Sequence, residues 1–225
     1  IIPANIAPQL SNSDFTIEFW AKILSSAEAN HTIYHQGIAQ IGKRIVIYLK
    51  NRPSVADDPV NGPSVGIYLD IANSHAVASL RNVLNFEFTN FNHFAIVYRT
   101  TTREALFYIN GILLTTTYFQ TNNFQNYSIT ASGEIIIGNS NFNGELKEIR
   151  IWKQARTHIE IEKDYHKLNC KNYLYNTYTG NYSPQLYIPI NSDFDNNNRT
   201  LITYNSNGDP NAGINLNNIS AIPYR

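Results

Sequence analysis

The sequence predicts an all-β protein, built as a sandwich or barrel of antiparallel strands with one short helix late in the chain. Short runs of alternating or continuously apolar residues recur along the chain, with turn-forming residues between them. An Asn-Gly pair stands between two such runs, which is a strong local signal of a β-hairpin. One segment combines helical spacing of apolar residues with a helix-capping motif.

The first expected strand covers residues 15–22. Phe15, Ile17 and Phe19 alternate there with polar residues, as in a half-buried strand. The pair Trp20-Ala21 interrupts the alternation. We therefore expect the end of this strand to be covered on both faces or to contain a β-bulge.

Further strands are expected at seven short runs. They are Ile45 to Lys50, Ser64 to Ile71, Phe94 to Arg99, Ala105 to Ile109, Ile112 to Thr117, Glu134 to Gly138 and Leu146 to Trp152. Asn110-Gly111 predicts a tight two-residue turn between two of these runs, because both residues tolerate positive φ. Residues 51–63 contain three prolines, so we expect an exposed loop rather than a central strand there.

The expected helix begins at the capping box Thr157-His158-Ile159-Glu160, and apolar residues follow at helical spacing as far as Leu168. The stretch 169–183 is rich in Asn, Tyr and Thr and is interpreted as a surface connection or a linker. Two short strands, at 184–190 and 200–204, complete the predicted elements.

Composition excludes several classes of protein. Lys and Arg total 17 and Asp and Glu total 17, so the net charge is zero, and no basic cluster is present that would bind nucleic acid. The apolar runs are far shorter than the roughly 20 residues that a membrane-spanning helix requires. The single cysteine, Cys170, cannot form an intramolecular disulfide. Because the chain begins at Ile1 without an initiator Met, we interpret it as an internal module of a larger protein.

The order of these motifs resembles that of laminin G-like domains, which belong to the concanavalin A-like jelly-roll superfamily. The run that begins at Phe15 is similar to the entry strand of that family, and His93 to Tyr98 is similar to a later strand. The resemblance continues through the Asn-Gly hairpin, the segment from Ile135 to Trp152 and the capped helix. It implies an antiparallel two-sheet jelly-roll sandwich. A looser similarity connects the Tyr- and Asn-rich tail with the lectin-like half of clostridial neurotoxin receptor-binding regions.

Residues 1–225 are expected to form one laminin G-like domain, because all-β sandwiches of this length are commonly single domains. The segment 169–225 has two interpretations. It is either a linker followed by strands that close this sandwich, or the start of a neighbouring domain, and the question concerns residues 184–225 above all.

No pair of carboxylates suited to glycoside hydrolysis is evident. A retaining enzyme of this fold needs two carboxylates about 5 Å apart on one face. Glu145 and Glu148 have an odd spacing and should point to opposite faces of a strand, and Glu18 has no carboxylate partner along its own strand. We therefore predict that the chain is not an enzyme, with a glycoside hydrolase as the weakest alternative.

The histidines are not expected to bind a metal ion. In a strand, His31 and His35 would share one face about 13 Å apart, too far to reach one ion, and they are interpreted as surface or rim residues. His93 opens a strand and is expected to be a packing residue.

Ca²⁺ is the one cofactor that the sequence suggests. Asp193, Asp195 and Asn197 place oxygen ligands at alternate positions, as at the start of a Ca²⁺-binding loop. Tyr204 stands where an EF-hand loop has its bidentate Glu, so a simple polar turn is the alternative. The cluster Asp57-Asp58 with Asn61 raises the same alternatives.

A surface of aromatic rings and amides is the candidate for ligand binding. Aromatic faces stack against the C–H faces of sugars while amides hydrogen-bond their hydroxyls. The candidate residues are Tyr118, Phe119, Phe124, Tyr127, Asn139 and Asn141. For any single ring, covering of a sandwich edge is the favoured alternative.

These observations predict a non-catalytic binding module of a larger secreted protein. The module would recognise a carbohydrate or glycoprotein receptor, outside the cell or on its surface, through loops and exposed aromatic residues. Other domains of the parent chain would be further partners, and the module itself would not insert into a membrane. The alternative is a structural spacer or assembly domain of a large adhesin or toxin.

Overall fold

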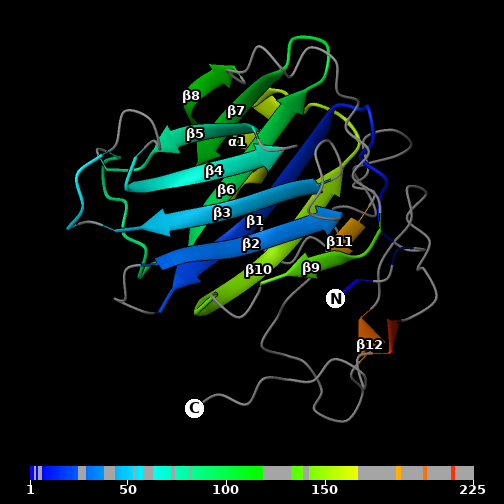
Figure 1. The fold of residues 1–225 in the computed structure, drawn as a ribbon, viewed down its shortest axis with the longest axis horizontal. Helices are drawn as coiled ribbons and strands as arrows, with labels where there is room; N and C mark the ends of the chain where they lie inside the picture. Colours follow the sequence, from blue (N-terminus) through cyan, green and yellow to red (C-terminus); the bar gives the residue numbers. More distant parts are fainter. Residues whose placement is uncertain are drawn as a thin grey trace.

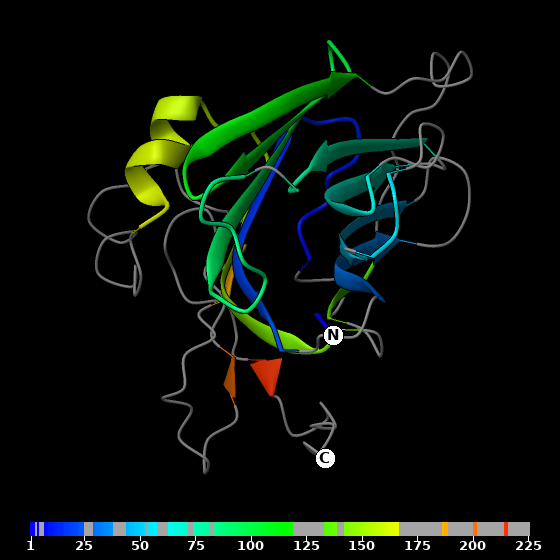
Figure 2. The same cartoon turned by 90° about the vertical axis from the view of Figure 1, so that its left-hand side faces the viewer.

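Two facing antiparallel sheets form the body of the molecule, and one short helix lies outside them (Figures 1 and 2). The computed structural model describes residues 1–2, 4, 7–24, 29–37, 44–52, 54–57, 63–71, 74–81, 83–118, 133–138, 142–166, 186–188, 200–201 and 214–215. The predicted all-β, two-sheet sandwich is confirmed.

The larger sheet has six strands in the order β11-β10-β1-β6-β7-β8. Its strands are β1 (Phe15–Ile23), β6 (Asn92–Arg99), β7 (Glu104–Ile109), β8 (Ile112–Tyr118), β10 (Gly144–Trp152) and β11 (Leu186–Ile188). All six overlap predicted strands. β11 joins this sheet by pairing with β10, although the division of the chain into domains stays a prediction.

The smaller sheet has five strands in the order β5-β4-β3-β2-β9. Its strands are β2 (Ala29–Gly37), β3 (Arg44–Asn51), β4 (Val65–Ile71), β5 (Ser74–Ser79) and β9 (Ile135–Ile137). A separate pair joins β12 (Thr200–Leu201) and β13 (Ile214–Asn215). β2, β5 and β13 were not among the predicted strands.

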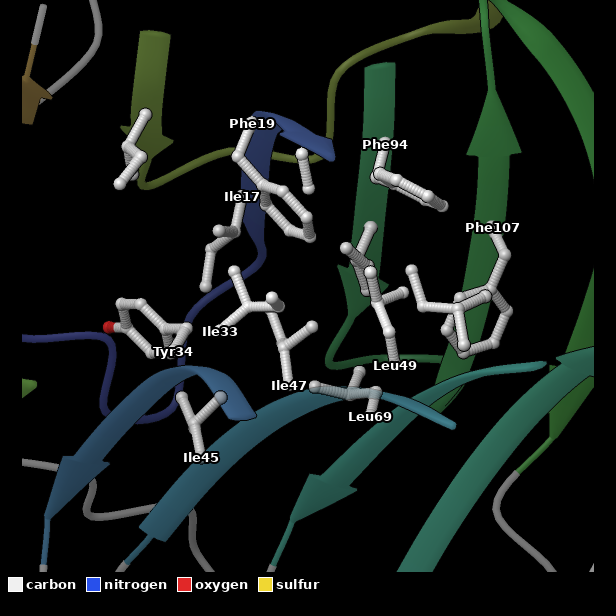
Figure 3. Packing of buried hydrophobic residues seen from close by; sticks show 14 of the residues in the cluster. Ile17, Phe19, Ile33, Tyr34, Ile45, Ile47, Leu49, Leu69, Phe94 and Phe107 are labelled. Carbon is white, nitrogen blue, oxygen red and sulfur yellow. The ribbon is translucent and has the colours of Figure 1, made fainter. Parts of the chain in front are cut away.

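The hydrophobic core fills the space between the two sheets. Phe15, Ile17 and Phe19 of β1 are fully buried there, as their alternation predicts. Figure 3 shows the two phenylalanines Phe19 and Phe94 beside the aliphatic side chains of β2 to β4, and the Phe19 and Phe94 rings are stacked with centroids 5.5 Å apart. The alternation of β1 continues to its end, because Trp20 lies on the outer face and Ala21 is buried in the core.

The helix α1 (His158–Asp164) covers part of the outer face of the six-stranded sheet, on the side away from the five-stranded sheet (Figure 2). It is one turn shorter than the predicted segment. Its capping box is present, because the Thr157 side chain accepts from the backbone N–H of Glu160 while Glu160 accepts from that of Thr157. Ile161 packs against the outward residues Ala95, Val97, Leu106 and Tyr108 of the sheet.

A buried cluster of charged residues fastens α1 to the sheet. Arg156, which precedes the helix, donates to Glu18 of β1 at 2.6 Å and to Asp164 of α1 at 2.5 Å. His93 of β6 lies 3.4 Å from Glu18, and Arg150 of β10 lies 3.8 Å from it. Burial alone raises the pKa of Glu18, but Arg156 and His93 outweigh it and hold this pKa at about 2. Burial lowers the pKa of His93, so its imidazole is neutral at pH 7.

A β-bulge in β10 changes the side to which Glu148 points. Trp20 pairs with Lys147 and Glu18 with Arg150, so β10 has one more residue than β1 between these pairs, and Glu148 has φ of 51°. As a result Glu148 lies beside Arg150, at 3.6 Å, on the outer face.

The prediction that Glu145 and Glu148 point to opposite faces is therefore wrong. Glu145 lies 3.3 Å from Lys22, which shares the outer face with Glu18 because the two are four residues apart on β1. Glu18 and Glu148 both contact Arg150 but are 0% and 2% exposed, so a substrate in solution cannot reach them.

The Asn110-Gly111 turn between β7 and β8 is confirmed. Both residues have positive φ, 48° and 81°. Gly111 also lies against Tyr165, which follows α1, and a Cβ at this position would come within 2.5 Å of the Tyr165 ring. The hairpin and the helix are thus in direct contact.

Candidate functional site

The predicted ligand and metal residues fall at the margin of the described structure or beyond it. Tyr118 is the last residue of β8, an edge strand, and its side chain is outside the described set. The others lie outside the described residues and stay predictions. They are Phe119, Phe124, Tyr127, Asn139 and Asn141 for ligand binding, and Asp193, Asp195 and Asn197 for Ca²⁺.

The two histidines of β2 do not share a face. The register of β2 against β3 shifts between Thr32 and Tyr34, which places a bulge between the histidines. His31 is 1% exposed and lies edge-on to Phe142, whereas His35 is half-buried on the outside of the sheet. The expectation of a shared face and of a surface position for His31 is therefore wrong. Within the described residues, no group of His, Cys, Asp or Glu is placed to hold a metal ion.

The strongest candidate site among the described residues is the outer face of the five-stranded sheet, made by the outward side chains of β2 to β5. We call it the β2–β5 face. Because Ile45, Ile47 and Leu49 of β3 point into the core, the residues that alternate with them point outward. The register of the four strands arranges these outward residues in three rows across the sheet. The rows are Asn30-Lys50-Gly66-Ser79, Thr32-Tyr48-Tyr68-Val77 and His35-Val46-Asp70-His75.

The middle row carries two stacked tyrosines. The rings of Tyr48 and Tyr68 are 4.6 Å apart and inclined by only 11°. Tyr68 is buried. Its hydroxyl donates to the carbonyl of Pro63, and the ammonium of Lys50 lies 5.3 Å from its ring centre. Tyr48 is half-buried, and across the strand on its other side stands the smaller Thr32. One face of the Tyr48 ring is thus left beside a small polar residue.

Asp70 of the third row forms an ion pair with Arg44 at the surface. Arg44, two residues before Val46 on β3, donates from Nη2 to Oδ2 of Asp70 at 2.7 Å. Their side chains keep 27% and 19% of their surface exposed, so both remain in contact with solvent. Within the described part of the chain, Nε of Arg44 is buried and has no hydrogen-bond partner, so the solvent contact of Arg44 is made by other atoms of its side chain.

Partial burial perturbs the ionisable groups of this face. Burial and then Asp70 raise the pKa of Tyr48 to about 12. Burial raises the pKa of Asp70 although Arg44 opposes it, and burial together with the charge of Arg44 lowers the pKa of His35. Clusters of perturbed groups on an accessible surface are typical of binding sites.

The connection between β3 and β4 borders the β2–β5 face, and Asp57 holds it in place. Oδ1 of Asp57 accepts from the backbone N–H and the hydroxyl of Ser64, and Arg81 lies 3.1 Å from it. The backbone N–H of Ser64, followed by Arg81, lowers the pKa of Asp57. This carboxylate is thus used as a loop anchor, while its predicted metal partners Asp58 and Asn61 lie outside the described residues.

Sequence reasoning did not select the residues of the β2–β5 face. The run Ile45 to Lys50 was correctly assigned to a strand, and its alternation already shows that Val46, Tyr48 and Lys50 share a face. Placing Asp70 and His35 beside them requires the register of three strands, which a single sequence does not provide.

No helix in the described part of the chain has the length and hydropathy needed to cross a bilayer.

Solved structures share the fold at low sequence identity. A heptameric pentraxin from Limulus polyphemus has a TM-score of 0.53 and 14% identity, over 68% of this chain and 70% of the pentraxin. A "putative carbohydrate binding protein" from Bacteroides ovatus has a TM-score of 0.56 and 13% identity, over 90% of this chain and 56% of that protein. A leech intramolecular trans-sialidase, solved with 2,7-anhydro-Neu5Ac, has a TM-score of 0.50 and 18% identity, over 69% of this chain and 24% of the enzyme.

The matched region therefore corresponds to little more than half of the Bacteroides protein and about a quarter of the leech enzyme. No curated protein matches the sequence significantly. A family model described as the concanavalin A-like lectin/glucanases superfamily matches residues 2–162. These residues include most of α1 and every strand of the two sheets except β11. The chain accordingly belongs to that superfamily.

Proposed function

We propose that this chain is a non-catalytic carbohydrate-binding module that holds a saccharide on its β2–β5 face. The observation that carries the proposal is the half-buried ring of Tyr48 beside the partly exposed Arg44–Asp70 pair. Binding a saccharide requires an aromatic ring against which the sugar C–H groups can pack. It also requires polar groups that form hydrogen bonds with the sugar hydroxyls.

The named relatives support the same class of ligand. The Bacteroides protein is named for carbohydrate binding, and the leech enzyme was solved with a sugar derivative. On this proposal the chain acts outside the cell or on its surface, as one domain of a larger protein, and its receptor is a glycan or glycoprotein. Ca²⁺ dependence through Asp193, Asp195 and Asn197 is part of the proposal.

The proposal is tested by saccharide titration of the folded chain, in Ca²⁺ and in chelator, followed by a Tyr48→Ala variant. We expect binding of at least one saccharide and a loss of about tenfold in affinity for Tyr48→Ala, because an aromatic contact contributes on the order of 1 kcal/mol. Tyr48→Phe should retain most of the affinity. The matched control is Ile159→Ala, since Ile159 is 71% exposed on α1, beyond the opposite sheet.

Failure of any saccharide to bind the folded chain would reject the proposal and favour the spacer or assembly role. Binding that persists unchanged in Tyr48→Ala would show that the chain binds saccharides elsewhere, with the edge at Tyr118 the next surface to test.

A further inference from the structure

We propose that the β2–β5 face selects an uncharged pyranose with two adjacent free hydroxyls, which Asp70 and Arg44 hold together while the sugar ring lies against Tyr48. This inference rests on the proposed saccharide-binding function and names the class of saccharide.

The ion pair between Arg44 and Asp70 leaves groups of opposite hydrogen-bonding character side by side. The pair uses Nη2 and Oδ2, joined at 2.7 Å. Among the described residues, Oδ1 of Asp70 receives no hydrogen bond. Nε of Arg44 is buried and cannot reach a ligand, but the pair with Asp70 occupies only one N–H of the two terminal guanidinium nitrogens, so further donors remain on Nη1 and Nη2. A carboxylate can only accept and a guanidinium can only donate. One ligand hydroxyl can therefore donate to Asp70 while its neighbour accepts from Arg44.

The distance between the ion pair and the aromatic ring fits one sugar unit. Val46 pairs directly with Asp70, and Tyr48 follows Val46 by two residues on β3. Two residues of a strand span about 6 to 7 Å, which is close to the width of a pyranose ring with its hydroxyls. Thr32, across from Tyr48, is small enough to leave room for that ring beside the tyrosine.

The charges of the site favour a neutral ligand. An acidic sugar would place its carboxylate near Asp70, and the repulsion would oppose its attraction to Arg44. If that carboxylate took Arg44 as its partner, Asp70 would lose its ion pair. Partial burial already disfavours the charged form of Asp70. A cationic sugar would meet Arg44 in the same way. Hydroxyls both donate and accept, so a neutral diol satisfies both groups without separating them.

The remaining ionisable groups around the pair do not reverse this balance at neutral pH. His35 on β2 is neutral there, because burial and Arg44 lower its pKa. Lys50 on β3 is engaged with Tyr68 of β4, whose hydroxyl lies 3.4 Å from its ammonium. His75 of β5 lowers the pKa of Asp70, and Glu134, which precedes β9, raises the pKa of His35, but burial outweighs both effects.

The experiment measures the affinity of the folded chain for matched probes. The probes are glucose- and galactose-based disaccharides, their glucuronic and galacturonic acid counterparts, and deoxy analogues that lack one of two adjacent hydroxyls. We expect neutral disaccharides to bind at least about tenfold more tightly than the acidic ones, and removal of one hydroxyl to cost a similar factor, since an unpaired polar group in the site is costly.

Two substitutions locate the effect. Asp70→Asn and Arg44→Met should each weaken the binding of neutral probes by about tenfold, and Asp70→Asn should reduce the preference for neutral over acidic probes. The control pair is Lys22→Met and Glu145→Gln, because Lys22 and Glu145 form a similarly exposed ion pair on the other sheet, with 30% and 37% exposure. These controls should bind as the unaltered chain does. Thermal unfolding of every variant verifies that the fold is kept.

The failures of the two proposals are distinguishable. If no probe binds, the saccharide-binding function itself is rejected. If acidic probes bind more tightly, or if Asp70→Asn and Arg44→Met bind neutral probes normally while Tyr48→Ala does not, the function stands and the proposed selection for neutral adjacent hydroxyls is overturned.

Discussion

Glu18 is an outward-facing residue of β1 that is buried and helps to hold α1 on the sheet. It alternates with core residues, so its side chain points out of the sandwich, yet it is completely buried under α1. Arg156 compensates its charge at 2.6 Å, and His93 and Arg150 lie within 4 Å. The pKa of about 2, against an ordinary 4.5, corresponds to about 3 kcal/mol of folding stability at pH 7.

We therefore expect Glu18→Gln to destabilise the fold by about 3 to 5 kcal/mol, because the charge of Arg156 would remain buried without its main partner. Urea unfolding measures the change. The control is Glu145→Gln, which removes a half-exposed ion pair with Lys22 and should cost less than about 1 kcal/mol. Equal effects of the two substitutions would contradict a special role for the buried cluster.

Single residues also show where sequence reasoning was limited. The capping residues Thr157 and Glu160 were identified from the sequence, because a capping box depends only on local spacing. The orientations of His31 and Glu148 were not, because a bulge shifts the alternation of each strand, between His31 and His35 in β2 and at Glu148 in β10. A bulge depends on pairing with a neighbouring strand, and a single strand's sequence does not show that pairing.

At the scale of elements, α1 is a helix that tertiary contacts stabilise. Its seven residues are too few for an isolated helix to be stable in water. Arg156 and Ile161 attach it to the sheet, and the capping box satisfies its first backbone N–H groups.

We expect Thr157→Ala to destabilise the protein by about 1 kcal/mol, since it removes the helix cap. Tryptophan fluorescence gives a local readout, because the chain contains two tryptophans and both lie on this side of the sheet. Trp152 is 4.4 Å from the Arg156 guanidinium, and Trp20 packs against His93. Thr102→Ala, in the turn between β6 and β7, is the control and should leave the emission unchanged; an identical change in both variants would contradict a local effect of the cap.

The strands missed from the sequence have a physical explanation. β2 contains Asn30, His31 and Gln36 among its apolar residues, and β5 contains mostly small residues, so neither has a strong period-2 pattern of large apolar side chains. Both strands form because β3 and β4 offer them hydrogen-bonding partners. Tertiary pairing here overrides weak local preference.

At the scale of the whole molecule, the buried ionisable groups make stability depend on pH in both directions. The pKa of His93 is lowered in the fold, so the unfolded chain binds its proton first as the pH falls below about 6.5. Stability should decline from that point. Glu18 adds a second loss between pH 4.5 and about 2. Tyr48 and Tyr98, whose pKa values are raised to about 12, cause a loss as the pH rises above 10.

Free energies of unfolding from urea titrations between pH 5 and pH 8 measure the acid limb. His93→Gln should flatten this limb by up to about 1.4 kcal/mol per pH unit, the effect of one proton. His35, whose pKa is also lowered, accounts for part of the remaining slope. His158→Gln provides the control, because it removes an imidazole that is 52% exposed and lies outside the buried cluster. An unchanged slope in His93→Gln would contradict a neutral, buried imidazole.

Sequence reasoning reached the architecture more completely than the candidate site. The fold follows from residues such as Phe15, Asn110 and Thr157, whose signals are local and appear in the correct order. The β2–β5 face depends on Asp70 and His35 lying on either side of Val46 of β3, which only the assembled sheet reveals. The rings and amides selected from the sequence, from Tyr118 to Asn141, remain predictions.

The contiguity of the β2–β5 face has a consequence for how such a domain can change its ligand. All three rows come from residues 30–79, and in β3, β4 and β5 the residues that alternate with them belong to the core. The anchor of α1 is encoded elsewhere, in β1, β6, β10 and the segment around Arg156. Positions that contact a ligand therefore alternate with positions that form the core within one short stretch of the sequence, and the two sets of positions are different. Substitution at the outward positions alone can diversify recognition, in evolution or in a designed library, while the core is inherited unchanged.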